Sequence, residues 1–141
     1  MPEIPQSLTL IAKPASLAPV TDFVRRGARE ANLPELHMHQ LELLIEEILV
    51  NIWQYSYPER APGTVAVTYS VPSPGEMEIE VADQGVEFDP LKAGPPDLTL
   101  DLSRRPVGGL GVFLLKSFAN SLNYRRHLGW NRLSFRISAN P

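Results

Sequence analysis

The stretch Leu41–Tyr57, LELLIEEILVNIWQYSY, is the part of the chain from which the fold is best read. Its apolar residues recur at helical spacing, which predicts an amphipathic helix with one face on the core. Those residues are Leu41, Leu44, Ile45, Ile48 and Ile52. Glu47 and Asn51 lie four residues apart on a shared face, with Tyr55 one turn further on. There a carboxylate can accept a proton and a carboxamide oxygen can bind Mg²⁺. A solvated helix edge is the alternative interpretation.

Composition sets the class of protein around this helix. A chain of 141 residues fits one domain with a sizeable core. Its formal net charge of −3 gives no electrostatic reason to expect binding to nucleic acid or to an anionic membrane. The chain has no cysteine, which suits a reducing compartment, and no apolar run long enough to cross a bilayer. We therefore expect one cytoplasmic domain, residues 1–141, without nucleic-acid or membrane partners.

The segments before the central helix predict a strand and a first helix. Ser7–Ala12 alternates between apolar and polar residues, as a half-buried strand does. Ser16 is a suitable N-cap for a helix that runs to about Ala31. Asn32 can end that helix, and Pro34 is well placed as the first residue of the central helix.

Two alternating segments follow the central helix and predict a hairpin. They are Thr64–Val71 and Glu76–Asp83, joined by a turn at Pro72–Gly75. Asp83 is in phase with the apolar residues of its strand, so the strand brings a carboxylate to its buried side. Such a carboxylate is costly unless it finds hydrogen-bond donors. Alternatively, Asp83 has left the strand and caps the following turn.

A long loop and a glycine cluster come next. Gly85 permits a positive φ or the close approach of a ligand. Leu91–Val107 has no convincing period, which is typical of a lid or of a disordered excursion. Gly108-Gly109-Leu110-Gly111 then opens an apolar helix, where free N–H groups can bind phosphate or glycines can allow tight packing on the sheet. The cluster matches neither a P-loop nor a dinucleotide fingerprint.

The chain closes on a second hairpin, Leu122–Arg126 and Asn131–Ser138, turned at Gly129. The predicted order is therefore β-α-α-β-β-loop-α-β-β. Strands joined by short turns pair antiparallel, and the helices must cover one face of the sheet. We expect an α+β fold: a two-layer α/β sandwich with a mixed, mostly antiparallel sheet and helices on one face.

Four segments together resemble the Bergerat-fold ATP-binding superfamily, which includes gyrase and the histidine kinases. They are EEILVNIWQYSYP, VADQGVEFDP, RPVGGLGVFLLKSF and the closing GWNRLSFRI. Within that superfamily the chain looks most like the anti-sigma-factor serine/threonine kinases of bacterial partner switching. The resemblance runs from the first predicted strand to the last and implies the Bergerat ATP-binding fold.

The resemblance implies ATP and Mg²⁺ as cofactors. It also assigns residues to adenine binding, to Mg²⁺ binding and to proton abstraction. Asp83 would accept the adenine amino group, and Gly85 would let the adenine edge approach. Asn51 would bind the Mg²⁺ that bridges the phosphates. Glu47 would be the general base for a serine or threonine hydroxyl, or would orient water on Mg²⁺ for slow hydrolysis.

The same resemblance places the phosphates against the glycine cluster. Gly108, Gly109, Leu110 and Gly111 would supply backbone N–H groups to them. The loop at about residues 90–107 would be the ATP lid, from which Arg104 or Arg105 would reach the γ-phosphate. Two positions depart from the usual pattern of the kinases: Tyr55 stands where many have histidine, and Asn120 where aspartate is frequent.

The implied function is phosphorylation of a STAS-type anti-sigma-factor antagonist by a kinase that also sequesters a sigma factor. A non-catalytic ATP-responsive module that sequesters a regulatory partner is the alternative. The detached catalytic domain of a histidine kinase is a third interpretation, which the lack of a phospho-acceptor helical pair disfavours. The family often dimerises, so a homodimer through the first strand and first helix is also an expectation.

Overall fold

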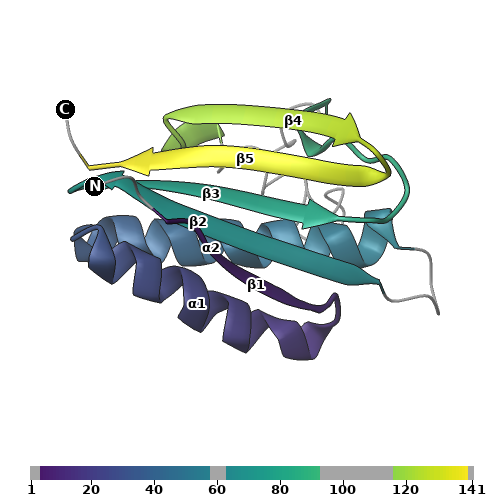
Figure 1. Cartoon of the computed structure of the whole chain (residues 1–141), viewed down its shortest axis with the longest axis horizontal. Helices are drawn as coiled ribbons and strands as arrows, with labels where there is room; N and C mark the ends of the chain where they lie inside the picture. Colours follow the sequence, from purple (N-terminus) through teal and green to yellow (C-terminus); the bar gives the residue numbers. More distant parts are fainter. Residues whose placement is uncertain (1–3, 58–62, 93–115, 140–141) are drawn as a thin grey trace, which may run out of the picture.

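A computed structural model of the chain describes residues 4–57, 63–92 and 116–139. Figure 1 shows its helices and strands. They are β1 (Gln6–Ile11), α1 (Leu17–Glu30), α2 (Glu35–Asn51), β2 (Thr64–Ser73), β3 (Glu76–Asp83), β4 (Ser121–His127) and β5 (Trp130–Ser138). Three short helical segments are η1 (Pro14–Ser16), η2 (Ile52–Ser56) and η3 (Pro90–Lys92). The predicted order is confirmed across these ranges, with the ends of the strands within two residues of those expected.

The five strands form one sheet in the order β1-β2-β3-β5-β4. Every pairing among the described strands is antiparallel, so the sheet is more regular than the mixed sheet that we allowed for. Both long helices lie on the same side of it (Figure 1). The prediction of a two-layer α+β sandwich is therefore confirmed.

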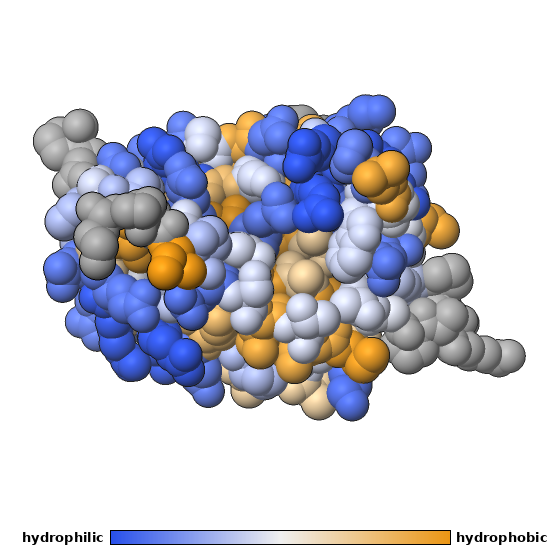
Figure 2. Space-filling view, in the orientation of Figure 1, coloured by the Kyte–Doolittle hydropathy of each residue, from blue (hydrophilic) through white to orange (hydrophobic). Residues whose placement is uncertain are grey.

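The core lies between this helix layer and one face of the sheet. Side chains from α1, α2 and alternate positions of the strands are almost completely buried there, among them Val24, Leu44, Val67, Met77 and Ile137. In Figure 2 hydrophilic residues cover much of the visible face, and hydrophobic residues show between them mainly toward its middle. None of the helices in the described ranges is long and apolar enough to cross a membrane.

The two ends of α1 differ from a simple capped helix. Ser16 holds the N-cap position but caps nothing with its side chain, because its hydroxyl donates to the Ile11 carbonyl instead. Ser16 is therefore the N-cap as predicted, by its position and not through its side chain. At the other end Asn32 has φ 57°, and the amides of Asn32 and Leu33 donate to the carbonyls of Arg29 and Ala28. That pattern is a Schellman motif, so Asn32 ends α1 as predicted.

The central helix also differs from the single helix that we predicted. Pro34 is its N-cap rather than its first residue, and the α-helical part ends at Asn51. The chain continues as a π-helical turn, η2, and the Tyr57 amide donates to the Ile52 carbonyl five residues back. The helix ends at Ser56, whose carbonyl accepts from the Val86 amide at 2.6 Å. A π-turn of this kind is frequent at functional sites.

The β2–β3 turn is tighter than predicted. β2 continues to Ser73 through an irregularity between Ser70 and Ser73, and the turn contains only Pro74 and Gly75, with Gly75 at φ 83°. The predicted lid lies outside the described residues except for η3, and so does the glycine cluster. Residues 116–118 are helical, where the helix expected after the glycines would end.

Candidate functional site

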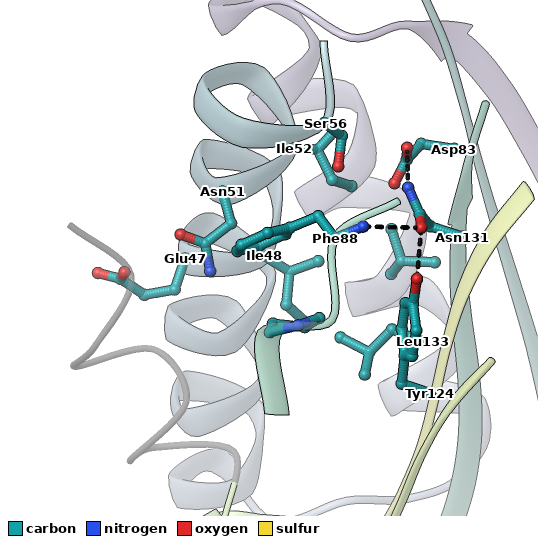
Figure 3. A pocket seen from close by; sticks show the side chains of 12 residues that line it. Glu47, Ile48, Asn51, Ile52, Ser56, Asp83, Phe88, Tyr124, Asn131 and Leu133 are labelled. Carbon is teal, nitrogen blue, oxygen red and sulfur yellow. Dashed lines mark hydrogen bonds between the residues drawn. The ribbon is translucent and has the colours of Figure 1, made fainter. Parts of the chain in front are cut away.

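A pocket lies between α2 with η2 on one side and the ends of β3 and β5 on the other. Its empty volume is about 420 Å³, a figure that includes space open to solvent. Its walls come from the helix, the sheet, the loop after β3 and Tyr124 on β4; the lining residues are Glu47, Ile48, Asn51, Ile52, Ser56, Val81, Asp83, Phe88, Pro90, Tyr124, Asn131 and Leu133. Figure 3 shows Glu47 and Asn51 on the helix and Asp83 and Asn131 across from them. Glu47, Asn51 and Asp83 therefore line one pocket, although Asp83 comes from a different element than the other two.

Asp83 is the last residue of β3 and is 3% exposed. Both interpretations of this residue are partly correct. Its alternation with Met77, Ile79 and Val81 points the carboxylate into the core side. At the same time Asp83 Oδ1 accepts the Gly85 amide at 2.9 Å, which is the turn-capping contact. A buried carboxylate is thus retained at the end of a strand, and backbone and side-chain donors surround it.

Those donors do not fully compensate the burial of Asp83. Burial raises the pKa of the carboxyl group above its ordinary value of 3.8. Hydrogen bonds from Asn131, Gly85 and Ser56, together with the charge of Arg126, oppose part of this rise. The ionised form of Asp83 is therefore held in the pocket at a cost to folding stability.

Gly85 is needed for a reason that the sequence did not disclose. In the described part of the chain the glycines with positive φ are Gly75 and Gly129, so Gly85 does not use that freedom. A Cβ on Gly85 would lie 2.1 Å from the Ser56 carbonyl oxygen. The loop after β3 therefore packs directly on the backbone of η2. Arg126 reinforces the loop from β4 by donating to the Gly85 carbonyl at 2.6 Å.

Asn51 stands at the other end of the pocket. The residue is 5% exposed, and within the described ranges its Oδ1 has no hydrogen-bond partner. Such a buried acceptor costs about 1–3 kcal/mol, which makes an unmet acceptor uncommon unless a ligand completes it. Glu47 lies one turn before it, and Figure 3 shows the carboxylate pointing away from Asp83. Burial, and then the charge of Glu46, raise the pKa of Glu47.

Asn131 is a site residue that the sequence reasoning missed. It lies opposite Asp83 in the β3–β5 register and is 4% exposed. Its Nδ2 donates to Asp83 Oδ1 at 2.9 Å and to the Val86 carbonyl at 2.8 Å. Its Oδ1 accepts from the Tyr124 hydroxyl at 2.6 Å and from the Phe88 amide at 3.2 Å. The available signal was its phase, because Asn131 alternates in step with the buried apolar residues of β5.

Two tyrosines, Tyr55 and Tyr57, hold the loop that follows β3. The rings of Phe88 and Tyr55 stack with centroids 5.0 Å apart and an angle of 22° between their planes. The Tyr57 hydroxyl donates to the Thr64 carbonyl at 2.5 Å and accepts the Gln84 amide at 2.7 Å. Tyr55, the first of the two departures noted from the sequence, thus holds Phe88. The loop after Asp83 is therefore attached to Tyr55 in η2 and to Tyr57 directly after it.

The residues predicted to bind the phosphates lie outside the part of the chain that the structure describes. Arg104 and Arg105 lie outside the described residues, as do Gly108, Gly109, Leu110 and Gly111. Across the three described ranges no group of three or more His, Cys, Asp or Glu side chains is arranged to hold a metal ion. Asn120, the second departure, receives the Ser138 amide on its side-chain oxygen at 2.8 Å and so has a structural role.

The fold and the pocket agree with a family assignment made from sequence. The model of the histidine kinase-like ATPase domain family matches residues 10–137, and the chain belongs to this family. It is 31% identical over 101 residues to serine/threonine-protein kinase BtrW of Bordetella bronchiseptica, which covers 72% of this chain and 70% of BtrW. It is 30% identical over 89 residues to serine-protein kinase RsbW of Bacillus thuringiensis, covering 60% of this chain and 54% of RsbW.

Solved structures support the same fold. The structure of the RsbU and RsbW domains of Rv1364c from Mycobacterium tuberculosis matches 97% of this chain with a TM-score of 0.66 at 14% identity. The match covers 33% of that longer chain. The blue-light-activated histidine kinase EL346 of Erythrobacter litoralis matches 75% of this chain with a TM-score of 0.55 at 23% identity. At these identities the likeness concerns the fold alone.

Proposed function

We propose that this chain is an ATP-dependent serine/threonine kinase of the anti-sigma-factor type, which phosphorylates a STAS-type anti-sigma-factor antagonist in partner switching. The family supports the use of ATP, and the names of BtrW and RsbW support a protein serine/threonine substrate. The resemblance of the four motifs is the basis for proposing the STAS-type antagonist as the substrate and a sigma factor as a second partner. The assignment of residues to ATP and Mg²⁺ belongs to the same proposal.

The unmet Asn51 Oδ1 is the observation that carries the proposal. A buried carboxamide oxygen without a partner among the described residues is a suitable ligand for a hard cation. Mg²⁺ in kinases is commonly held by one or two protein side chains together with phosphates and water. A site with one protein ligand therefore suits Mg²⁺ better than it suits a metal ion that is bound by protein side chains alone. When bound, Mg²⁺ would offset the negative charge of the phosphates during transfer.

Asp83 fits the base of ATP for a complementary reason. In its ionised form the carboxylate can only accept hydrogen bonds, so it favours a ligand with an N–H donor. The pocket wall beside it is apolar, with Ile48, Val81 and Leu133 available to contact the face of a flat ring. An adenine amino group provides the donor, and the ring provides the apolar faces.

Glu47 fits the role of general base. Its raised pKa brings it closer to that of a proton acceptor working at neutral pH, and its carboxylate lies toward the outer end of the pocket. A protein hydroxyl arriving there would give its proton to Glu47 as its oxygen bonds to the γ-phosphorus, while the bond from that phosphorus to the bridging oxygen breaks and ADP leaves. A module that only binds ATP has no evident need for this carboxylate.

The experiment is phosphoryl transfer from radiolabelled MgATP to STAS proteins of the same organism. We expect the wild-type chain to label one of them and Glu47→Gln to bind MgATP with unchanged affinity but to label none. Glu35→Gln is the matched control, because Glu35 is an exposed glutamate at the far end of the same helix. Wild-type ATP binding with ATP-dependent capture of the STAS protein, but no labelling, would favour the non-catalytic module. Absence of ATP binding would refute both functions.

A further inference from the structure

Asn131 has a saturated and directional set of hydrogen bonds. A carboxamide has two N–H donors and an oxygen with two lone pairs, and all four are used here. The partners of Nδ2 are the Asp83 carboxylate and the Val86 carbonyl, both of which can only accept. The Phe88 amide, which can only donate, is a partner of Oδ1. Rotating the amide by 180° would oppose acceptor to acceptor and donor to donor, so its orientation is unique.

This orientation decides which oxygen of Asp83 is available. Oδ1 receives two donors, Asn131 Nδ2 and the Gly85 amide, each at 2.9 Å. Two donors use the lone pairs of that oxygen. Figure 3 shows the other oxygen, Oδ2, pointing toward Ser56 and the helix. The Ser56 hydroxyl is the remaining donor to Asp83, so one lone pair of Oδ2 stays open to the interior of the pocket.

We propose that Asn131 is the positioning residue of the base-binding end: it holds Asp83 Oδ1 and thereby presents Oδ2 to the amino group of a purine. This assignment rests on the proposed nucleotide site. Asn131 acts through Asp83 and contacts no reacting atom. The same carboxamide also holds the loop that covers the pocket, through the Val86 carbonyl and the Phe88 amide. One side chain therefore positions both the Asp83 carboxylate and this loop.

The test is Asn131→Asp, which keeps the shape of the side chain and removes the Nδ2 donors. At pH 8 the introduced carboxylate faces Asp83 and repels it, so we expect the MgATP affinity to fall about tenfold or more. At lower pH a proton shared by the two carboxyl groups restores a donor to Asp83, so the loss should become smaller toward pH 6. The charged groups around the pair stay the same in the variant: Arg126 on β4, Glu87 and Asp89 in the loop, and Glu47 on α2.

Asn123→Asp is the matched control, because Asn123 is exposed on β4 and the substitution adds the same charge. We expect wild-type affinity for MgATP from this variant at both pH values. An equal loss at pH 6 and pH 8 in Asn131→Asp would show a merely structural defect and overturn the proposal. Wild-type affinity at both pH values would also overturn it.

A ligand-free measurement separates this proposal from the proposed function. NMR titration of the Asp83 carboxyl group should give a higher pKa in Asn131→Asp than in the wild type, because a donor is replaced by a second carboxyl group. If the wild type binds no ATP, the nucleotide function fails and this titration still tests Asn131. An unchanged Asp83 titration would refute the positioning role. Should Asn131→Asp not fold, Tyr124→Phe removes only the hydroxyl donor to Asn131 Oδ1 and should weaken MgATP binding about threefold.

Discussion

The two ends of the pocket differ in how completely the protein satisfies them. At the Asp83 end, Asn131, Gly85 and the loop after β3 form a saturated polar cluster. At the Asn51 end, the carboxamide oxygen has no partner in the part of the chain that the structure describes. In the proposed function, the first end is formed before a ligand arrives, and a ligand would complete the second. The difference fits a base that is recognised by a rigid surface and phosphates that bring their own metal and charge.

Substitution of Asp83 should have the largest effect. In Asp83→Asn an amide replaces one of the two acceptor oxygens, so the site offers a donor where the purine amino group needs an acceptor. We expect a loss of MgATP affinity of about a hundredfold or more by calorimetry. Wild-type affinity in this variant would remove Asp83 from the base site.

Removing the saturated carboxamide should damage the fold. Asn131→Leu leaves the Asp83 carboxylate, the Val86 carbonyl and the Phe88 amide without their partner in the interior. We expect the free energy of unfolding to fall by about 3 kcal/mol. Chemical denaturation of the ligand-free protein measures this change. A decrease below about 1 kcal/mol would mean that the cluster is not saturated by Asn131.

Asp83 should also make stability depend on pH in a defined direction. Because burial raises its pKa in the folded state above 3.8, the folded chain binds this proton more tightly than the unfolded chain. Its contribution to the free energy of unfolding is therefore largest below pH 3.8 and decreases as pH rises through the folded pKa. Asp83→Asn lacks this contribution. The free energy of unfolding of the wild type minus that of the variant should therefore decrease as pH rises. A difference that is constant from pH 3 to pH 7 would contradict the raised pKa.

Replacing Asn51 by leucine, as a counterpart to Asn131→Leu, should change the free energy of unfolding least and in the opposite direction. Asn51→Leu removes an unmet buried acceptor and adds apolar contact, so we expect the free energy of unfolding to rise by about 1 kcal/mol. Binding of MgATP should weaken in the same variant, because the metal ligand is lost. Destabilisation of Asn51→Leu comparable to that of Asn131→Leu would erase the contrast between the two ends.

Sequence patterns predicted much of this protein because they depend on local periodicity. The alternation of Glu76–Asp83 and of β5 gave the buried faces of two strands, and the helical stripe of Leu41–Ile52 gave the packed face of α2. Asp83 could be found in the same way, since a polar residue in phase with a buried face stands out. Asn131 had the same phase but was overlooked, because its meaning depends on the strand that lies opposite.

What needed three dimensions was contact between segments far apart in the chain. The pairing of Asp83 with Asn131 spans 48 residues and follows from the β3–β5 register, which no local pattern specifies. The π-turn at η2 and the requirement for glycine at position 85 both arise where Ser56 meets the loop after β3. Local sequence determined which residues are polar on a buried face, because side-chain direction follows the period of each element. Tertiary packing decided which of them meet and which is left for a ligand, because hydrogen-bond partners are set by distance in space.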